Sequence, residues 1–365
     1  MWPLRMTAAL LLMLCGMFAS CADRYGMRVV SSERRDGYEC RHIEFSAGGE
    51  ERIRAYLLVP DSSCLRKLPA VLMLHDHGAR FDIGKEKLVR PAADAPVRIR
   101  NSSRQWVEKY FDGVYFGDRL ASEGYVVLVA DALYWGERSS PDACRWSELS
   151  YGDRQDPGSL RYGMPEERLE AEKKRLKEAV YEGQRDVYDS LAAGGTVWAR
   201  KILEEDIACA GLLRSLPYVD GNRIGAFGFS MGAHRCWLLS AFCRDVSCGA
   251  AVCWMTVKKN YDSSSASDLS MRIPSMRDTL DFPDIASFLA PKPMLFLCGD
   301  KDSLFPAGDA GEAFSKMHAI YDGIQSQELA GQALETAFFD GGHHCGKKVQ
   351  AAVADFFARR LQPGK

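Results

Sequence analysis

The residues best suited to chemistry in this chain centre on a serine within the stretch Gly-Phe-Ser-Met-Gly at 228–232. An apolar run, 223–227, precedes this stretch and a helical pattern, 231–243, follows it. A turn this tight between a strand and a helix holds a serine exposed, and it needs glycines because flanking β-carbons would not fit. The helix N-terminus adds free amide groups and a positive dipole beside the hydroxyl. The pattern predicts Ser230 as a nucleophile.

A serine hydroxyl becomes a useful nucleophile only with a base beside it. Two histidines, His343 and His344, follow the last strand-like run in a glycine-rich loop. We expect His343 to be the base because it directly follows the glycine pair, with His344 as the alternative. The acid that orients the base is expected after the preceding strand-like run, where Asp302 lies deeper in the loop than Asp300. The sequence therefore predicts a triad of Ser230, Asp302 and His343, with Asp300 as a loop-capping group.

A serine hydrolase also needs hydrogen-bond donors for the negative charge that develops on the substrate carbonyl oxygen. The backbone N–H of Met231, directly after the serine, is the first expected donor. The second is expected from the loop after the apolar run 69–75. In that loop the N–H of His77 is preferred and that of Ala79 is the alternative.

The same loop also permits a metal-site interpretation. His75, Asp76 and His77, joined by His343 and His344, would supply ligands for a zinc hydrolase. No other residues have ligand spacing, and a zinc site would leave the glycine-flanked serine unexplained. We therefore expect no metal and no cofactor.

The elements that must position these residues alternate between strand-like and helix-like patterns. The strand-like runs are 38–47, 52–59, 69–75, 125–130, 223–227, 249–254, 293–298 and 334–339. The helical patterns are 116–123, 197–216, 231–243, 308–321 and 347–361. Continuous apolar runs suit strands covered on both faces, and their alternation with helices indicates a mostly parallel sheet between helices.

One segment, 134–195, interrupts this alternation with about 60 residues that contain no strand-like run. Within it, 165–191 is highly charged and has one apolar stripe, which is typical of an amphipathic helix. Such a helix is either laid over the sheet with one face in solvent or is a cap that shapes a substrate cleft. Three aromatic residues stack on sugar rings in one interpretation and form the core of the segment in the other: Tyr134, Trp135 and Trp146.

The N-terminus has the pattern of a signal peptide, with Arg5 before an apolar run too short to span a membrane well. Phe-Ala-Ser-Cys at 18–21 resembles a bacterial lipobox, in which Cys21 becomes the lipid-modified N-terminus; simple cleavage near Ala22 is the alternative. We expect an exported protein, anchored to a membrane only through Cys21 and otherwise secreted. Residues 1–21 would be the signal and 22–365 a single domain.

Composition excludes several other classes of protein. The chain has 365 residues, 47% hydrophobic and 26% charged, which is an ordinary globular balance. A net charge of −2 leaves no basic field for nucleic acid or an anionic membrane. None of the 12 cysteines forms a CxxC pair, and the apolar runs around Cys253 and Cys298 predict buried thiols. The sequence leaves the oligomeric state undetermined.

With these patterns in place, residues 38–361 resemble the α/β-hydrolase superfamily. More narrowly, they resemble dienelactone hydrolase-like and acetyl xylan esterase-like hydrolases of bacteria. Three further stretches carry the resemblance. Residues 75–87 are similar to the HDHG…GKEK segment of an exported branch of these esterases, 131–138 resemble their D…GER loop after the fourth strand, and 216–224 resemble the stretch that leads into their nucleophile.

The resemblance implies an α/β-hydrolase fold with a helical insert after the fourth strand and an esterase that acts on acetylated plant or host glycans. The residues alone support hydrolysis of an acyl ester in a small-molecule or carbohydrate substrate. Glucuronoyl esterases are similar proteins that carry arginine after the nucleophile, so Met231 argues against a uronate ester here. Glu137 and Arg138 are expected to pin their loop as an ion pair, or alternatively to line the cleft.

Two other functions are compatible with this fold. A serine peptidase is one, although no repeat in the sequence indicates the propeller domain that such peptidases often carry. An inactive surface-binding protein that presents the insert is the other, and the predicted triad argues against it.

Overall fold

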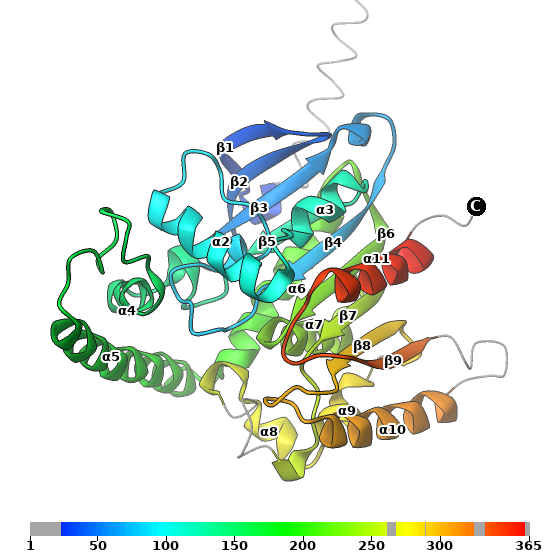
Figure 1. Cartoon of the computed structure of the whole chain (residues 1–365). Coiled ribbons are helices and arrows are strands. Elements are labelled where there is room, and N and C mark those ends of the chain that lie inside the picture. The colour runs from blue at the N-terminus through cyan, green and yellow to red at the C-terminus, as the bar shows by residue number, and fades with distance from the viewer. Residues whose placement is uncertain (1–22, 261–267, 289, 325–332, 362–365) are drawn as a thin grey trace, which may run out of the picture.

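The computed structural model describes residues 23–260, 268–288, 290–324 and 333–361 (Figure 1). The predicted signal peptide and Cys21 lie outside the described residues. None of the helices in the described part combines the length and the apolar character needed to cross a bilayer.

A mixed sheet of nine strands forms the centre of the molecule, in the order β1-β2-β3-β5-β4-β6-β7-β8-β9. Its strands are β1 Arg28–Arg35, β2 Tyr38–Ser46, β3 Arg52–Pro60, β4 Leu68–Leu74, β5 Val126–Ala130, β6 Val219–Phe229, β7 Cys248–Val252, β8 Met294–Gly299 and β9 Leu334–Phe339. The strands from β5 to β9 in this order run parallel, and β1, β2 and β3 form an antiparallel extension. The predicted mostly parallel sheet is confirmed.

Helices cover both faces of the sheet (Figure 1). The α-helices in the described residues are α2 Val97–Phe111, α3 Phe116–Ser122, α4 Pro141–Tyr151, α5 Glu166–Ala193, α6 Trp198–Ser215, α7 Met231–Phe242, α8 Pro274–Arg277, α9 Phe282–Ala286, α10 Ala307–Ile324 and α11 Lys347–Leu361. On β4, Val71 and Met73 pack into the apolar cluster with α2, α3 and α11, whereas Leu72 and Leu74 pack with α6 and α7. This alternation explains why the strand reads as an unbroken apolar run.

The sequence patterns missed β1, α2 and α4. Strand β1 is polar and mostly exposed, and it pairs with β2 at the edge of the sheet. Because such a strand has no continuous apolar face, it has no strong sequence signal. Helix α2 is also polar over most of its surface and buries only a few side chains, among them Trp106, Val107 and Phe111.

The insert forms two packed helices, α4 and α5, at the side of the molecule (Figure 1). Leu169 and Leu176 of α5 pack with Leu149 of α4 in a small separate cluster. Further along α5, Val180 and Val187 pack against the main apolar cluster. The predicted apolar stripe of α5 thus packs against α4 at one end and against the main apolar cluster at the other. Most of the charged face of α5 is in solvent.

Candidate active site

The nucleophile turn forms where β6 ends at Phe229 and α7 begins at Met231. Ser230 has φ 55° and ψ −124°, a backbone conformation that residues other than glycine seldom adopt. A β-carbon at Gly228 would lie 1.8 Å from the carbonyl oxygen of Gly232. One at Gly232 would lie 1.9 Å from the carbonyl oxygen of Leu74, on the neighbouring strand β4. Both glycines are therefore required by close backbone approach.

Three polar side chains from separate loops meet at this turn. Nε2 of His343 lies 2.9 Å from the Ser230 hydroxyl, and Nδ1 lies 2.8 Å from Oδ2 of Asp302. The other carboxylate oxygen of Asp302 accepts the N–H groups of Leu304 and Phe305, at 2.8 and 3.1 Å. Because an ionised carboxylate only accepts, Nδ1 of a neutral His343 carries the proton and Nε2 is free to accept one from the serine.

The competing candidates lie elsewhere. Asp300 accepts the N–H of Gly341 at 2.9 Å, which is the loop-capping role expected for it. His344 directs Nε2 toward a carboxylate oxygen of Asp112, at 3.2 Å. The structure therefore brings Asp302 and His343 to Ser230. Asp300 and His344 make their contacts with other residues.

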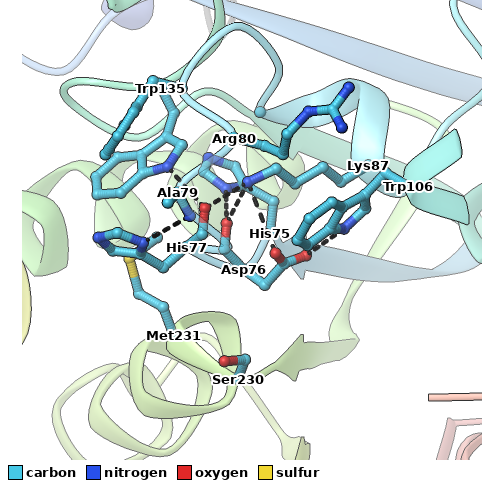
Figure 2. A network of polar contacts seen from close by, with 12 residues as sticks. His75, Asp76, His77, Ala79, Arg80, Lys87, Trp106, Trp135, Ser230 and Met231 are labelled. Atoms are coloured by element: carbon cyan, nitrogen blue, oxygen red, sulfur yellow. Dashed lines mark hydrogen bonds and ion pairs between the residues drawn. The ribbon is translucent and has the colours of Figure 1, made fainter. Parts of the chain in front are cut away.

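Of the two backbone donors expected for the oxyanion, Met231 directly follows Ser230, and His77 lies on the loop after β4 and lines the same cavity as Ser230 (Figure 2). Within the described residues, neither the N–H of Met231 nor that of His77 donates to a protein acceptor. The alternative donor, the N–H of Ala79, is already bonded to Nδ1 of His77 at 3.0 Å. The geometry favours Met231 and His77 over Ala79.

A cavity of about 420 Å³ opens at Ser230. The polar residues around it include His77, Asp268 and His343. Its apolar walls come from Trp106, Tyr110, Phe229, Trp254, Met271, Leu304 and Phe305. None of its described lining residues belongs to the insert 134–195, so α2, which the sequence missed, occupies the place that the cap interpretation gave to the insert.

His77 and Asp268 lie side by side in the wall of this cavity. Nε2 of His77 lies 3.3 Å from Oδ2 of Asp268, and the Ala79 N–H on Nδ1 leaves the histidine proton on Nε2. Burial raises the pKa of Asp268, but its contact with His77 and the hydrogen bonds from Ser270 outweigh burial and lower that pKa to about 2. The cavity wall therefore carries an ionised carboxylate at neutral pH.

The metal-site interpretation finds little support in the geometry. The ring of His75 is fully buried; its Nδ1 lies 3.0 Å from a carbonyl oxygen of its own loop, and its Nε2 accepts the Ala132 N–H. In the described part of the chain, the group of potential ligands that converges is Cys253, Asp302 and His343. Burial raises the pKa of the Cys253 thiol to about 12, so this thiol is protonated and a poor ligand at neutral pH.

The loop at 131–138 is pinned by ion pairs, although not by a pair between Glu137 and Arg138. Arg138 bonds to Glu205 at 2.7 Å and to Glu51 at 2.6 Å. Glu137 bonds to the ammonium of Lys85 at 2.8 Å. Neither Glu137 nor Arg138 lines the cavity at Ser230, so cleft lining is not the role that the geometry gives them.

The aromatic residues proposed as sugar platforms are core residues. Tyr134 and Trp135 are 5% and 0% exposed, and Trp146 packs against the same apolar cluster. The two cysteines predicted as buried thiols, Cys253 and Cys298, are buried and free.

A twisted, mostly parallel sheet, a nucleophile turn after β6, and an acid and a histidine at the ends of later strands define an α/β-hydrolase. The model of the Dienelactone hydrolase family matches residues 111–323, and the chain belongs to that family. It is therefore a hydrolase.

Several known proteins are similar to this chain in sequence or in fold. The protein YtaP of Bacillus subtilis (strain 168), assigned as a hydrolase, is 27% identical over 301 residues, which cover 80% of this chain and 79% of YtaP. Protein BF1801 of Bacteroides fragilis NCTC 9343, assigned as an acetyl xylan esterase, superposes with a TM-score of 0.59 at 14% identity. The superposition covers 86% of this chain and 69% of the BF1801 chain.

A glucuronoyl esterase from Solibacter usitatus has a TM-score of 0.54 at 11% identity, covering 92% of this chain and 86% of its own. Acetyl Xylan Esterase 1 from Thermoanaerobacterium sp. JW/SL YS485 has a TM-score of 0.50 at 16% identity. That match covers 94% of this chain and 92% of the esterase. At these identities the structural likeness is one of fold.

Proposed function

We propose that this chain is a serine carboxylic-ester hydrolase with Ser230, His343 and Asp302 as its triad. The observation that carries the proposal is the unbroken line of hydrogen bonds from Asp302 through His343 to Ser230, at the floor of an open cavity. A histidine between a buried carboxylate and a half-buried serine that lines a cavity is arranged to take the hydroxyl proton.

In the proposed reaction the Ser230 oxygen attacks the ester carbonyl carbon while Nε2 of His343 takes its proton. Asp302 keeps the imidazole oriented and stabilises its charged form. The N–H groups of Met231 and His77 stabilise the tetrahedral oxyanion. His343 then protonates the leaving alcohol, and a water molecule removes the acyl group from the serine by the same steps in reverse order.

We further propose that the substrate is a neutral acyl ester, with acetyl groups on carbohydrates as the favoured class. The negative charge of Asp268 in the cavity wall disfavours anionic substrates. The Met231 side chain is buried and uncharged, so it offers no cationic contact to a uronate. The acetyl xylan esterases that share the fold support this choice.

Hydrolysis of p-nitrophenyl acetate, butyrate and octanoate, together with acetate release from acetylated xylan, tests the substrate class. We expect the highest kcat/KM on the acetyl esters because the acetyl xylan esterases that share the fold favour this acyl class for the present chain. Exclusive activity on octanoate would contradict the proposal. EDTA should leave the rates unchanged, and an EDTA loss that zinc restores would revive the metal-site interpretation.

The adjacent histidines provide a matched pair of variants. His343→Ala should reduce kcat by about 10⁴-fold or more because the base in contact with Ser230 is lost. His344→Ala should retain most of the activity, since that ring contacts Asp112. Steady-state rates per folded protein measure both, and equal losses in the two variants would argue against the assignment of the base.

We also propose that the chain is exported as a lipoprotein anchored through Cys21, on the basis of its N-terminal sequence alone. Mass spectrometry of the mature N-terminus from the native host should find a diacylglyceryl group on Cys21, and Cys21→Ser should release the protein from membranes. An unmodified N-terminus at or after Ala22 would favour simple cleavage instead.

A further inference from the structure

Two buried lysines lie on one short turn, Lys85–Lys87, between β4 and α2. The Lys87 ammonium donates to the carbonyl oxygens of Asp76 and His77, at 2.7 and 2.8 Å, and lies 3.6 Å from the Asp76 carboxylate. It also lies 5.2 Å from the ring centre of Trp106. None of these contacts is part of the triad.

The position of Lys87 determines where two peptide N–H groups point. In a planar trans peptide, the carbonyl of one residue and the N–H of the next point in opposite directions. A cation that holds the Asp76 carbonyl therefore turns the His77 N–H away from itself. By the same geometry, its bond to the His77 carbonyl turns the Gly78 N–H away as well.

The side away from Lys87 is the side of the nucleophile. Figure 2 shows Lys87 and Trp135 on one side of the 75–79 loop, with Ser230 and Met231 on the other. His77 and Gly78 line the cavity at Ser230, whereas Lys87 does not. The N–H groups that Lys87 orients are thus directed toward the cavity in which the oxyanion would form.

This loop needs such a restraint because Gly78 has φ 55° and glycine readily adopts other backbone conformations. A β-carbon at Gly78 would lie 2.1 Å from the Trp106 ring, so a stiffer residue does not fit there. The indole of Trp135 donates to the His77 carbonyl at 3.1 Å and assists Lys87. Without these donors the 77–78 peptide could rotate and point its carbonyl at the substrate.

A purely structural role would not call for a charge at this position. Burial of an ammonium is costly, and an apolar side chain would fill the same volume at lower cost. Burial lowers the pKa of Lys87 to about 8, although the Asp76 and Asp82 charges partly offset this effect. The ammonium retained here can instead orient the two carbonyls and add positive potential near the developing oxyanion.

We propose that Lys87 is a positioning residue for the oxyanion hole, holding the His77 N–H toward the substrate carbonyl through the carbonyls of Asp76 and His77. This inference rests on the proposed esterase function.

The test compares Lys87→Met with Lys85→Met. Lys85 is equally buried and paired, but its ammonium bonds to Asp131 and Glu137 rather than to the loop carbonyls. Rates on p-nitrophenyl acetate are expressed per active site titrated with a fluorophosphonate. Binding of an aryl trifluoromethyl ketone, which forms a tetrahedral adduct with a serine, is measured in parallel.

For Lys87→Met we expect kcat to fall by about 10²-fold with KM within about threefold of wild type. The affinity for the ketone should fall by the same factor as kcat/KM. Lys85→Met should lower the melting temperature but keep kcat per titrated site and the ketone affinity. A parallel loss in ketone binding is what a merely structural role of Lys87 would not produce.

Normal kcat in Lys87→Met, or a loss of kcat without a loss of ketone affinity, overturns the inference while leaving the esterase proposal intact. If Lys87→Met does not fold, Trp135→Phe replaces it, because this variant removes the indole bond to the His77 carbonyl and leaves an aromatic ring in place. It should lower kcat and ketone affinity together by about fivefold. Unchanged values in that variant overturn the inference. Wild-type protein without esterase activity would instead reject the proposed function.

Discussion

Ser230→Ala is expected to abolish both ester hydrolysis and covalent labelling by a fluorophosphonate probe. The variant removes the only oxygen within hydrogen-bond distance of Nε2 of His343 in the described part of the chain, so no acyl-enzyme can form. The loss in kcat should be on the order of 10⁶-fold, as when the serine of a cooperating triad is removed. Rates on p-nitrophenyl acetate and gel fluorescence of the labelled protein measure the two effects.

The matched control is Ser303→Ala, an exposed serine that directly follows Asp302 in the loop after β8. It should label and hydrolyse as the wild type does, because its hydroxyl lies outside the hydrogen-bond line from Asp302 to Ser230. Labelling that persisted in Ser230→Ala would place the nucleophile elsewhere. Because alanine retains the same β-carbon, circular dichroism and the melting temperature should change little.

Gly232→Ala is expected to have the largest effect on stability. Its β-carbon would lie 1.9 Å from the carbonyl oxygen of Leu74 and 3.1 Å from that of His75. Both atoms are backbone, at the end of a strand buried on both faces, so neither side can move cheaply. We expect a loss of about 3 kcal/mol in the free energy of unfolding, measured by urea denaturation.

Gly308→Ala is the control for this substitution. Gly308 lies in α10, and a β-carbon there would have no atom within 4 Å. Alanine also restricts the unfolded chain, so this variant should be as stable as wild type or more stable by about 0.5 kcal/mol. A Gly232→Ala protein with wild-type stability would show that β4 and α7 do not approach as closely as described.

The local sequence patterns predicted the parallel core well because buried strands leave a signal that is independent of their partners. β4 and β5 are fully buried, and their apolar runs report that burial directly. Helices α2 and α4 and strand β1 were missed because they are anchored by a few contacts to residues distant in the chain. For α2, that anchor is the Trp106 indole bonded to Asp76, at 3.1 Å.

The sequence by itself determined the class of the fold and the short motifs that hold the reactive groups. Ser230 could be named because a serine between glycines, after a strand and before a helix, has a conformation that local residue types decide. The sequence favoured Asp302 over Asp300 and His343 over His344 from their places in the two loops. The tertiary structure showed which member of each pair reaches the triad, because that depends on the direction in which each side chain points.

The tertiary structure also decided what surrounds the reactive groups. It placed α2 rather than the insert beside Ser230, and it turned Lys85 and Lys87, two residues apart, toward different loops. The physical reason is the same in each case. Periodicity and turn chemistry depend on neighbours along the chain, whereas hydrogen bonds such as that from Lys87 to Asp76 depend on how separate elements pack against one another.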